Sequence, residues 1–233
     1  MPLMVTKATG GTAQPTESTY VPPEAQAAAA PSPAFSDAGM NGAFVMDLLS
    51  ACVAHERCGA HLYRSVAGRT NDSELRHNYE LFGAETREHI GKLEMLIIEA
   101  GGDPNYVSPS ARATERAAGG ILESTYLLSG SVDAWTAEFV MLEAVMLAEA
   151  KDHSNWELLA QLAIGMTGTP LAELMLNTTE EVFAQEEEHY DWARETRTRL
   201  LFQQATAGEM DIPGRSQMTR DELEAALNDR GGA

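Results

Sequence analysis

The chain has 233 residues, 44% of them hydrophobic and 22% charged, which is enough for one sizeable domain with terminal extensions. Its 35 acidic and 16 basic residues give a net charge of -19, which repels nucleic acids and anionic membranes and attracts cations. No apolar run approaches the roughly 20 residues of a membrane helix, and the N-terminus lacks the apolar stretch of a signal peptide, so we expect a cytoplasmic protein without a membrane segment.

The first 40 residues differ in composition from the rest of the chain. Residues 1–40 are rich in Ala, Pro, Thr, Ser and Gly and show no sustained periodicity, which predicts a disordered arm. From about residue 41 apolar residues such as Val45, Leu49 and Cys52 recur every three or four positions, as on one face of a helix. The polar run GRTNDS at 68–73 ends this first predicted helix.

Three further long helices are predicted along the chain. The second ends at the GGDP sequence of 101–104, and residues 103–130 form a Pro-, Ser- and Gly-containing link with one or two short helices. The third spans about 131–164, and the fourth spans about 170–204 after the break at GMTGTP. No strand pattern is evident. The sequence therefore predicts an all-α bundle in which one long connection joins two antiparallel helical hairpins.

Each of the four long helices places an acidic residue within its apolar stripe, and the second and fourth helices add a histidine. In the second helix the acid and histidine are four residues apart, and in the fourth they are three apart, so each pair shares a face. The inward-facing polar residues are Glu56, Glu85, His89, Glu149, Glu186 and His189.

These acidic residues should also meet at one height in the bundle. Glu56 and Glu85 are about equally far from the first hairpin turn, as are Glu149 and Glu186 from the second. Unpaired carboxylates are very costly to bury, and two metal ions would neutralise them. Glutamates together with Glu-x-x-His pairs are the ligand set of di-iron and di-manganese bundles. The neighbouring run at 187–188 is expected to face water.

The two hairpins show a weak internal symmetry. In HERCGAHLY (55–63) the aromatic Tyr63 follows Glu56 by seven residues, and in AEAKDHSNW (148–156) Trp156 follows Glu149 by the same distance. A hairpin repeated about a pseudo-twofold axis would produce this pattern. Asp152 lies one turn after Glu149 on the same helix.

The chain resembles the ferritin-like superfamily over about 41–204, in particular bacterioferritin and rubrerythrin. QEEEHYDW (185–192) is similar to the bacterioferritin helix that supplies an E-x-x-H ligand pair followed by D-W. Glu56 with Tyr63 resembles the first-helix glutamate and the tyrosine that hydrogen-bonds near the site, and Glu149 resembles the third-helix glutamate. The resemblance implies a ferritin-like four-helix bundle with two iron ions, or manganese, and a catalytic role for Tyr63.

One position departs from the family pattern. ETREH (85–89) resembles the second-helix EExxH of rubrerythrins, but Thr86 stands where the second glutamate is expected. Glu85 is the acidic residue that remains on this face, so we expect it to serve as a ligand with His89. The CxxC pairs of a rubredoxin domain are absent, and the methionines form no haem pair. We therefore expect neither rubredoxin-type iron nor haem.

The C-terminal segment 205–233 forms a separate predicted unit. MDIPGRSQMTRDELEAAL (210–227) resembles the small helix-extended-helix modules of the Rho N-terminal and SAP type, and Thr219 with Glu222 fits a capping box. Some such modules bind nucleic acid, but this one carries few basic and several acidic residues. Its charge does not favour nucleic acid as a partner.

The sequence thus predicts a dinuclear non-haem metal protein that acts on Fe(II) with O2 or peroxide, in iron homeostasis or oxidative stress, as a homo-oligomer of two or more chains. The same ligands suit an Fe(II) oxidase, a peroxidase-type oxidoreductase and manganese-catalase-like chemistry. One alternative is a metal-free ferritin-like protein that acts as a structural or stress-associated partner through its tails. Another, weaker alternative is iron storage in a hollow shell.

Overall fold

The computed structural model describes residues 33–127, 130–166, 168–205, 225 and 227. Within these residues the regular structure is entirely helical: α2 (Pro33–Asp37), α3 (Gly42–Ala67), α4 (Ser73–Glu99), α5 (Pro109–Leu127), α6 (Ala134–Gly165) and α7 (Pro170–Ala205). None of these helices is both long and apolar enough to cross a membrane. The predicted C-terminal module at 205–233 and residues 1–32 of the predicted arm lie essentially outside the described residues.

Short polar side chains and glycines set the ends of the long helices. Asn41, Asp72 and Asp133 each accept a hydrogen bond from backbone N–H groups in the first turn of the next helix, which satisfies donors that a helix leaves unpaired. Gly101, after α4, and Gly168, after α6, have φ of +81° and +80°, in the left-handed region that favours glycine. The four long helices expected from the periodicity are all present.

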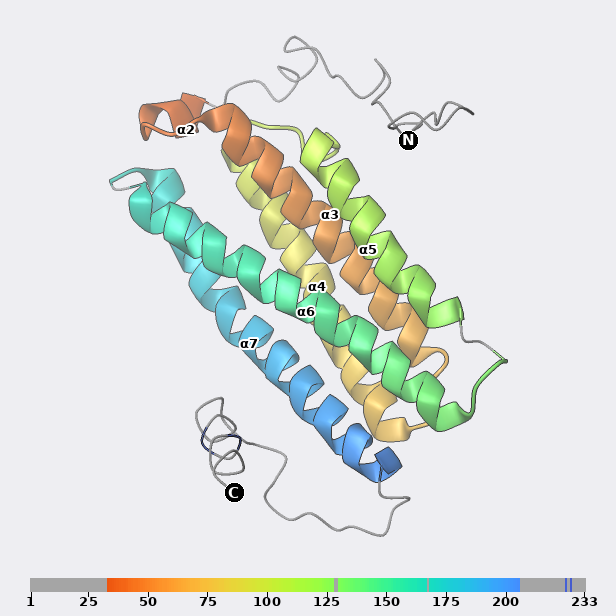
Figure 1. The fold of residues 1–233 in the computed structure, drawn as a ribbon. Coiled ribbons are helices and arrows are strands. Elements are labelled where there is room, and N and C mark those ends of the chain that lie inside the picture. Colours follow the sequence, from red (N-terminus) through yellow and green to blue (C-terminus); the bar gives the residue numbers. More distant parts are fainter. Residues whose placement is uncertain (1–32, 128–129, 167, 206–224, 226, 228–233) are drawn as a thin grey trace, which may run out of the picture.

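The long helices lie side by side in one bundle (Figure 1). α3 packs along α4 and α6 packs along α7, so each hairpin is a closely packed unit, and α3–α6 and α4–α7 contacts join the two hairpins. Two apolar clusters fill the interior. One contains Leu49, Leu93, Leu159 and Met175 near the α2 end, and the other contains Leu62, Phe82, Leu142 and Ala193 toward the opposite end.

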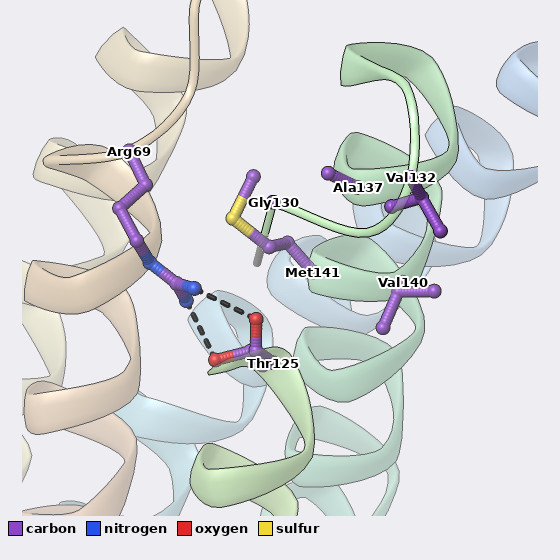
Figure 2. Close-up of a pocket in the computed structure, with 7 residues that line it drawn as sticks. All are labelled: Arg69, Thr125, Gly130, Val132, Ala137, Val140 and Met141. Carbon is purple, nitrogen blue, oxygen red and sulfur yellow. Dashed lines mark hydrogen bonds between the residues drawn. The ribbon is translucent and has the colours of Figure 1, made fainter. Parts of the chain in front are cut away.

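The connection between the hairpins differs from the sequence expectation, because most of it forms one 19-residue helix, α5, along α3. Gly119 and Gly120 lie inside this helix, although each costs about 1 kcal/mol relative to alanine. Tertiary packing outweighs that cost. Ala118 is buried, and the guanidinium of Arg69 donates to the backbone carbonyl and the hydroxyl of Thr125 at 2.8 and 2.6 Å (Figure 2).

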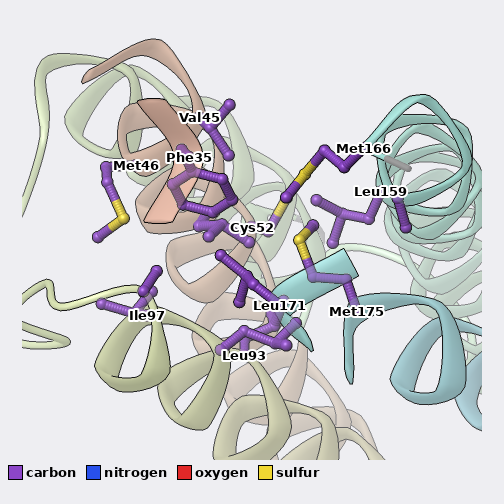
Figure 3. Packing of buried hydrophobic residues seen from close by; sticks show 14 of the residues in the cluster. Phe35, Val45, Met46, Cys52, Leu93, Ile97, Leu159, Met166, Leu171 and Met175 are labelled. Atoms are coloured by element: carbon purple, nitrogen blue, oxygen red, sulfur yellow. The ribbon is translucent and has the colours of Figure 1, made fainter. Parts of the chain in front are cut away.

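The end of the predicted N-terminal arm also belongs to the folded part. Phe35 of α2 is 0% exposed and packs in the first apolar cluster with Val45, Met46 and Ile97 (Figure 3). A large aromatic side chain gains enough from burial to order the short segment that carries it. Composition alone assigned residues 33–40 to the arm because a single aromatic residue changes the average little.

A close approach of α3 and α4 generates a prediction about stability. A Cβ atom at Gly83 would lie 2.9 Å from the Cβ of Tyr63, whereas a Cβ at Gly91 on the same helix would meet nothing within 4 Å. We expect Gly83→Ala to lower the free energy of unfolding by roughly 1–3 kcal/mol because the helices must move apart. The matched Gly91→Ala change should raise it by about 0.5–1 kcal/mol. Urea unfolding monitored by circular dichroism measures both, and equal stabilities would contradict the close contact.

Candidate metal centre

A layer of ionisable side chains separates the two apolar clusters. α3, α4, α6 and α7 each contribute to it at the same height, and each member is at most 4% exposed. Charged groups are found this deep in proteins when they are paired, protonated or bound to metal. The residues of this layer are Glu56, His89, Glu149, Asp152, Glu186 and His189.

Five of these residues form two groups that can each hold a metal ion. Glu56, His89 and Glu186 make the first group, and Glu149, Glu186 and His189 make the second; within each, one ligand atom per residue lies within 4.8 Å of the others. Glu186 belongs to both groups. Its Oε1 atom lies 2.8 Å from Nδ1 of His89 and 3.9 Å from Nδ1 of His189, and the two imidazole centroids are 6.0 Å apart.

Both histidines turn the same nitrogen toward the centre. The outer Nε2 atom of His89 contacts the side-chain oxygen of Gln185 at 3.1 Å, and Nε2 of His189 contacts Glu85 at 2.7 Å. An acceptor at Nε2 places the proton there and leaves the Nδ1 lone pair directed inward, as in metal-ligating histidines. Nδ1 of His89 lies 2.8 Å from Glu186 and Nδ1 of His189 lies 3.5 Å from Glu149, but neither Nδ1 atom has a hydrogen-bond partner.

Two glutamates are oriented by aromatic side chains that cross between the hairpins. The indole Nε1–H of Trp156 donates to Oε1 of Glu56, and the hydroxyl of Tyr63 donates to Oε1 of Glu149, both at 2.8 Å. Tyr63 is on the helix of Glu56 and Trp156 is on the helix of Glu149, so each aromatic residue serves the glutamate of the other helix. The seven-residue spacing between glutamate and aromatic residue, which the sequence shows in both hairpins, corresponds to these two crossed hydrogen bonds.

Every member of the layer retains a buried polar atom without a hydrogen-bond partner. These atoms are Glu56 Oε2, His89 Nδ1, Glu149 Oε2, Asp152 Oδ1, Glu186 Oε2 and His189 Nδ1. Each such atom destabilises the fold by the cost of removing it from water. Metal ions fit this arrangement because carboxylate oxygens and imidazole nitrogens are the donors that iron and manganese accept.

Burial and crowding change how the carboxyl groups ionise. Burial, and then the charge of Asp152, raise the pKa values of Glu56 and Glu186 well above the usual range. Burial also raises the pKa of Asp152 to about 6, partly offset by the nearby His55. Without cations, therefore, Glu56 and Glu186 favour their neutral, protonated forms, whereas Asp152 is protonated only below about pH 6.

The histidines respond in opposite directions. Burial lowers the pKa of His89 to about 4, so its imidazole is neutral at physiological pH. Burial also acts to lower the pKa of His189, but the carboxylates of Glu149 and Glu85 outweigh it and raise the value above its usual range. A neutral imidazole is the form that binds metal.

The remaining predicted ligand, Glu85, lies differently from the other five. Its side chain is 25% exposed and reaches the outer nitrogen of His189, and it belongs to neither of the two groups. Thr86 is buried, but its hydroxyl donates to the backbone carbonyl of Phe82 at 2.8 Å. Within the two groups α4 therefore contributes His89 alone. As expected, Glu187 and Glu188 are exposed.

Two residues gain a place that the sequence analysis did not give them. Asp152 joins the buried layer; its position one turn after Glu149, and a loose similarity of this pair to an added acid of rubrerythrin, were the signals in the sequence. Gln185 contacts His89, and it precedes Glu186 in α7 as Glu85 precedes Thr86 in α4. The crossed pairs Gln185–His89 and Glu85–His189 thus follow the same internal symmetry as the aromatic residues.

No protein-family model matches the chain, and comparisons with curated proteins and with solved structures find no match. The resemblance to ferritin-like proteins consequently rests on the residues quoted from the sequence.

The contact between Glu85 and His189 predicts how Glu85 acts. We expect Glu85→Gln to weaken Mn(II) binding about 10- to 100-fold, because the glutamine holds the imidazole less firmly, while the number of ions bound per chain stays the same. Glu88→Gln, an exposed change one residue before His89, is the matched control and should leave binding unchanged. Equilibrium titration followed by electron paramagnetic resonance measures both. Loss of one ion per chain in Glu85→Gln would instead make Glu85 a ligand.

Proposed function

We propose that the chain is a ferritin-like dinuclear metal protein, an oxidoreductase that uses its buried site to oxidise Fe(II) or to reduce O2 or peroxide. The observation that carries this proposal is the sharing of Glu186 by two buried groups, each completed by one histidine and one further glutamate. Glu186 would therefore be a ligand of both ions.

The ligand assignment follows the two groups. One ion would be held by Glu56, His89 and Glu186, and the other by Glu149, His189 and Glu186. Ferritin-like dinuclear sites use one glutamate from each of two helices and a Glu-x-x-His pair from each of the other two. α3, α6 and α7 supply their parts of this set, whereas α4 supplies its histidine without the glutamate.

Charge balance supports two divalent ions. The three glutamates of the two groups carry three negative charges when ionised, and Asp152, buried in the same layer, supplies a fourth. Two divalent ions would neutralise all four, which removes the cost of burying the carboxylates. Asp152 thereby compensates for the acid that α4 lacks at Thr86.

Iron bound in the site would supply redox chemistry toward O2 or peroxide. The chain's own residues prepare the ligands for it. Tyr63 and Trp156 each hold one oxygen of a glutamate and leave the other directed inward. The ring of Phe82, with its centroid 4.3 Å from that of His189, helps to exclude bulk water. The net charge of -19 raises the local concentration of Fe2+ near the protein.

A metal-free interaction protein is the alternative, and the position of Thr86 favours it. Its hydroxyl is engaged by the Phe82 carbonyl, so the second helix offers no bridging group at this position. In that case Glu56 and Glu186 would stay protonated, and the protein would act through its tails.

Substitution of the shared glutamate tests the proposed function. In an anaerobic Fe(II) titration followed by exposure to air, we expect the unaltered protein to bind two irons per chain and to oxidise them faster than free iron. Glu186→Gln should lose saturable binding of both ions because both groups depend on this carboxylate. Glu187→Gln, an exposed change at the next residue, should behave like the unaltered protein. Absence of saturable binding in the unaltered protein would support the metal-free alternative.

A further inference from the structure

A groove between α3 and α4 lies outside the metal centre and has a different chemistry. It is open to solvent and has a volume of about 570 Å³. Buried Tyr63, Tyr79 and Gly83 form its floor, and its rim carries the exposed Arg64, Arg76 and Arg87. The groove exists partly because small residues stand where the two helices approach, as the contact of Gly83 with Tyr63 illustrates.

The rim is unusual for so acidic a chain. The protein has 16 basic residues against 35 acidic ones, yet three arginines border this one groove. Within the described residues these three form no ion pair with a carboxylate. Of the other arginines in the described part of the chain, four pair with acidic side chains: Arg57 with Glu94, Arg194 with Asp191, Arg197 with Glu143 and Arg199 with Glu74. Arg69, Arg112 and Arg116 do not, so the distinctive feature of the groove is that three such arginines border one hollow.

Two of the three guanidinium groups are held in place by partners other than carboxylates. Arg76 donates to the backbone carbonyls of Ala67 and Thr70 at 3.3 and 2.6 Å, and Arg64 contacts Nδ1 of His61 at 3.0 Å. These contacts orient the cations without neutralising them. An anion that binds there meets donors that are partly ordered in advance, which lowers the entropic cost of binding.

The chemistry of the rim defines a class of ligand. Guanidinium groups bind phosphate and carboxylate through paired N–H donors, and a pocket of several hundred Å³ accommodates a small organic molecule. Glu80 is the carboxylate among the lining residues, and it can accept hydrogen bonds from hydroxyl or amino groups. We infer that the groove binds a small phosphorylated organic molecule with hydroxyl or amino groups, of the nucleotide class.

The groove is adjacent to the metal centre but does not depend on it. The side chain of Tyr63 lines the groove, and its hydroxyl donates to Glu149 at 2.8 Å. The side chain of Tyr63 would therefore be all that separates an anion bound in the groove from Glu149 of the buried layer. Because none of the residues that line the groove belongs to the two metal-binding groups, the inference does not rest on the proposed function.

Isothermal titration calorimetry on the full, chelator-treated chain tests the site, with adenosine diphosphate and inorganic phosphate as separate probes. Adenosine diphosphate should bind saturably, at one per chain, and more tightly than inorganic phosphate, with an affinity that falls as salt rises. Arg87→Ala should weaken its binding about tenfold or more, the loss expected for a charge-assisted hydrogen bond. Arg116→Ala, which removes an exposed arginine of α5, should leave binding unchanged.

Three results would overturn the inference. These are absence of saturable nucleotide binding, binding that Arg87→Ala leaves unchanged, and inorganic phosphate binding as tightly as the nucleotide. The thermal unfolding temperature of each variant, expected to match that of the unaltered chain because both arginines are exposed, shows that any loss arises at the groove. Metal-free protein is used throughout, so failure of the iron chemistry and failure of this site are observed separately.

Discussion

The structure depends on the burial of six ionisable side chains in one layer across the bundle. Removal of carboxylates and imidazoles from water is costly, and the apolar clusters on both sides offer these groups no polar partners. The layer is therefore stable only with protons or cations between its acids. The remaining features result from this constraint. The four long helices meet at one height, and each surrounding polar side chain contacts one oxygen or nitrogen of a buried residue and leaves that residue's other oxygen or nitrogen directed inward.

Pairs of contacts that cross between the hairpins organise this layer. Tyr63 and Trp156 orient the glutamates, and Glu85 and Gln185 contact the outer nitrogens of the histidines, so each helix of one hairpin supports a partner in the other. Because these contacts run in both directions between the hairpins, the geometry of the centre depends on how the two hairpins pack. Thr86 breaks the symmetry, since α4 carries no carboxylate where α7 carries Glu186. Asp152 of α6 adds a further buried acid to the layer.

Much of the layer could be predicted because helical periodicity and distance from a turn fix both the face and the height of a residue. Glu56, Glu149 and Glu186 were found in this way. The position of Glu85 could not be predicted in the same way. Residues three and four before His89 share a broad face of the helix, and a small rotation of the helix decides which of them points to the centre. The length of α5 exceeds the one or two short helices expected in the link, because packing on α3 outweighs the low helix propensity of its glycines, and a single sequence does not reveal that contact.

The dependence of stability on pH and metal tests the central claim most directly. The raised pKa values of Glu56, Glu186 and Asp152 mean that the folded, metal-free chain binds more protons than the unfolded chain, so its free energy of unfolding should fall as pH rises above about 4. His189 adds to this fall, while His89, with a pKa lowered to about 4, opposes it below about 6.5. We predict lower stability at pH 8 than at pH 5 in urea unfolding, a smaller fall in Glu186→Gln, and recovery at pH 8 with Mn(II). Equal stability at both pH values, with no effect of Mn(II), would contradict the account.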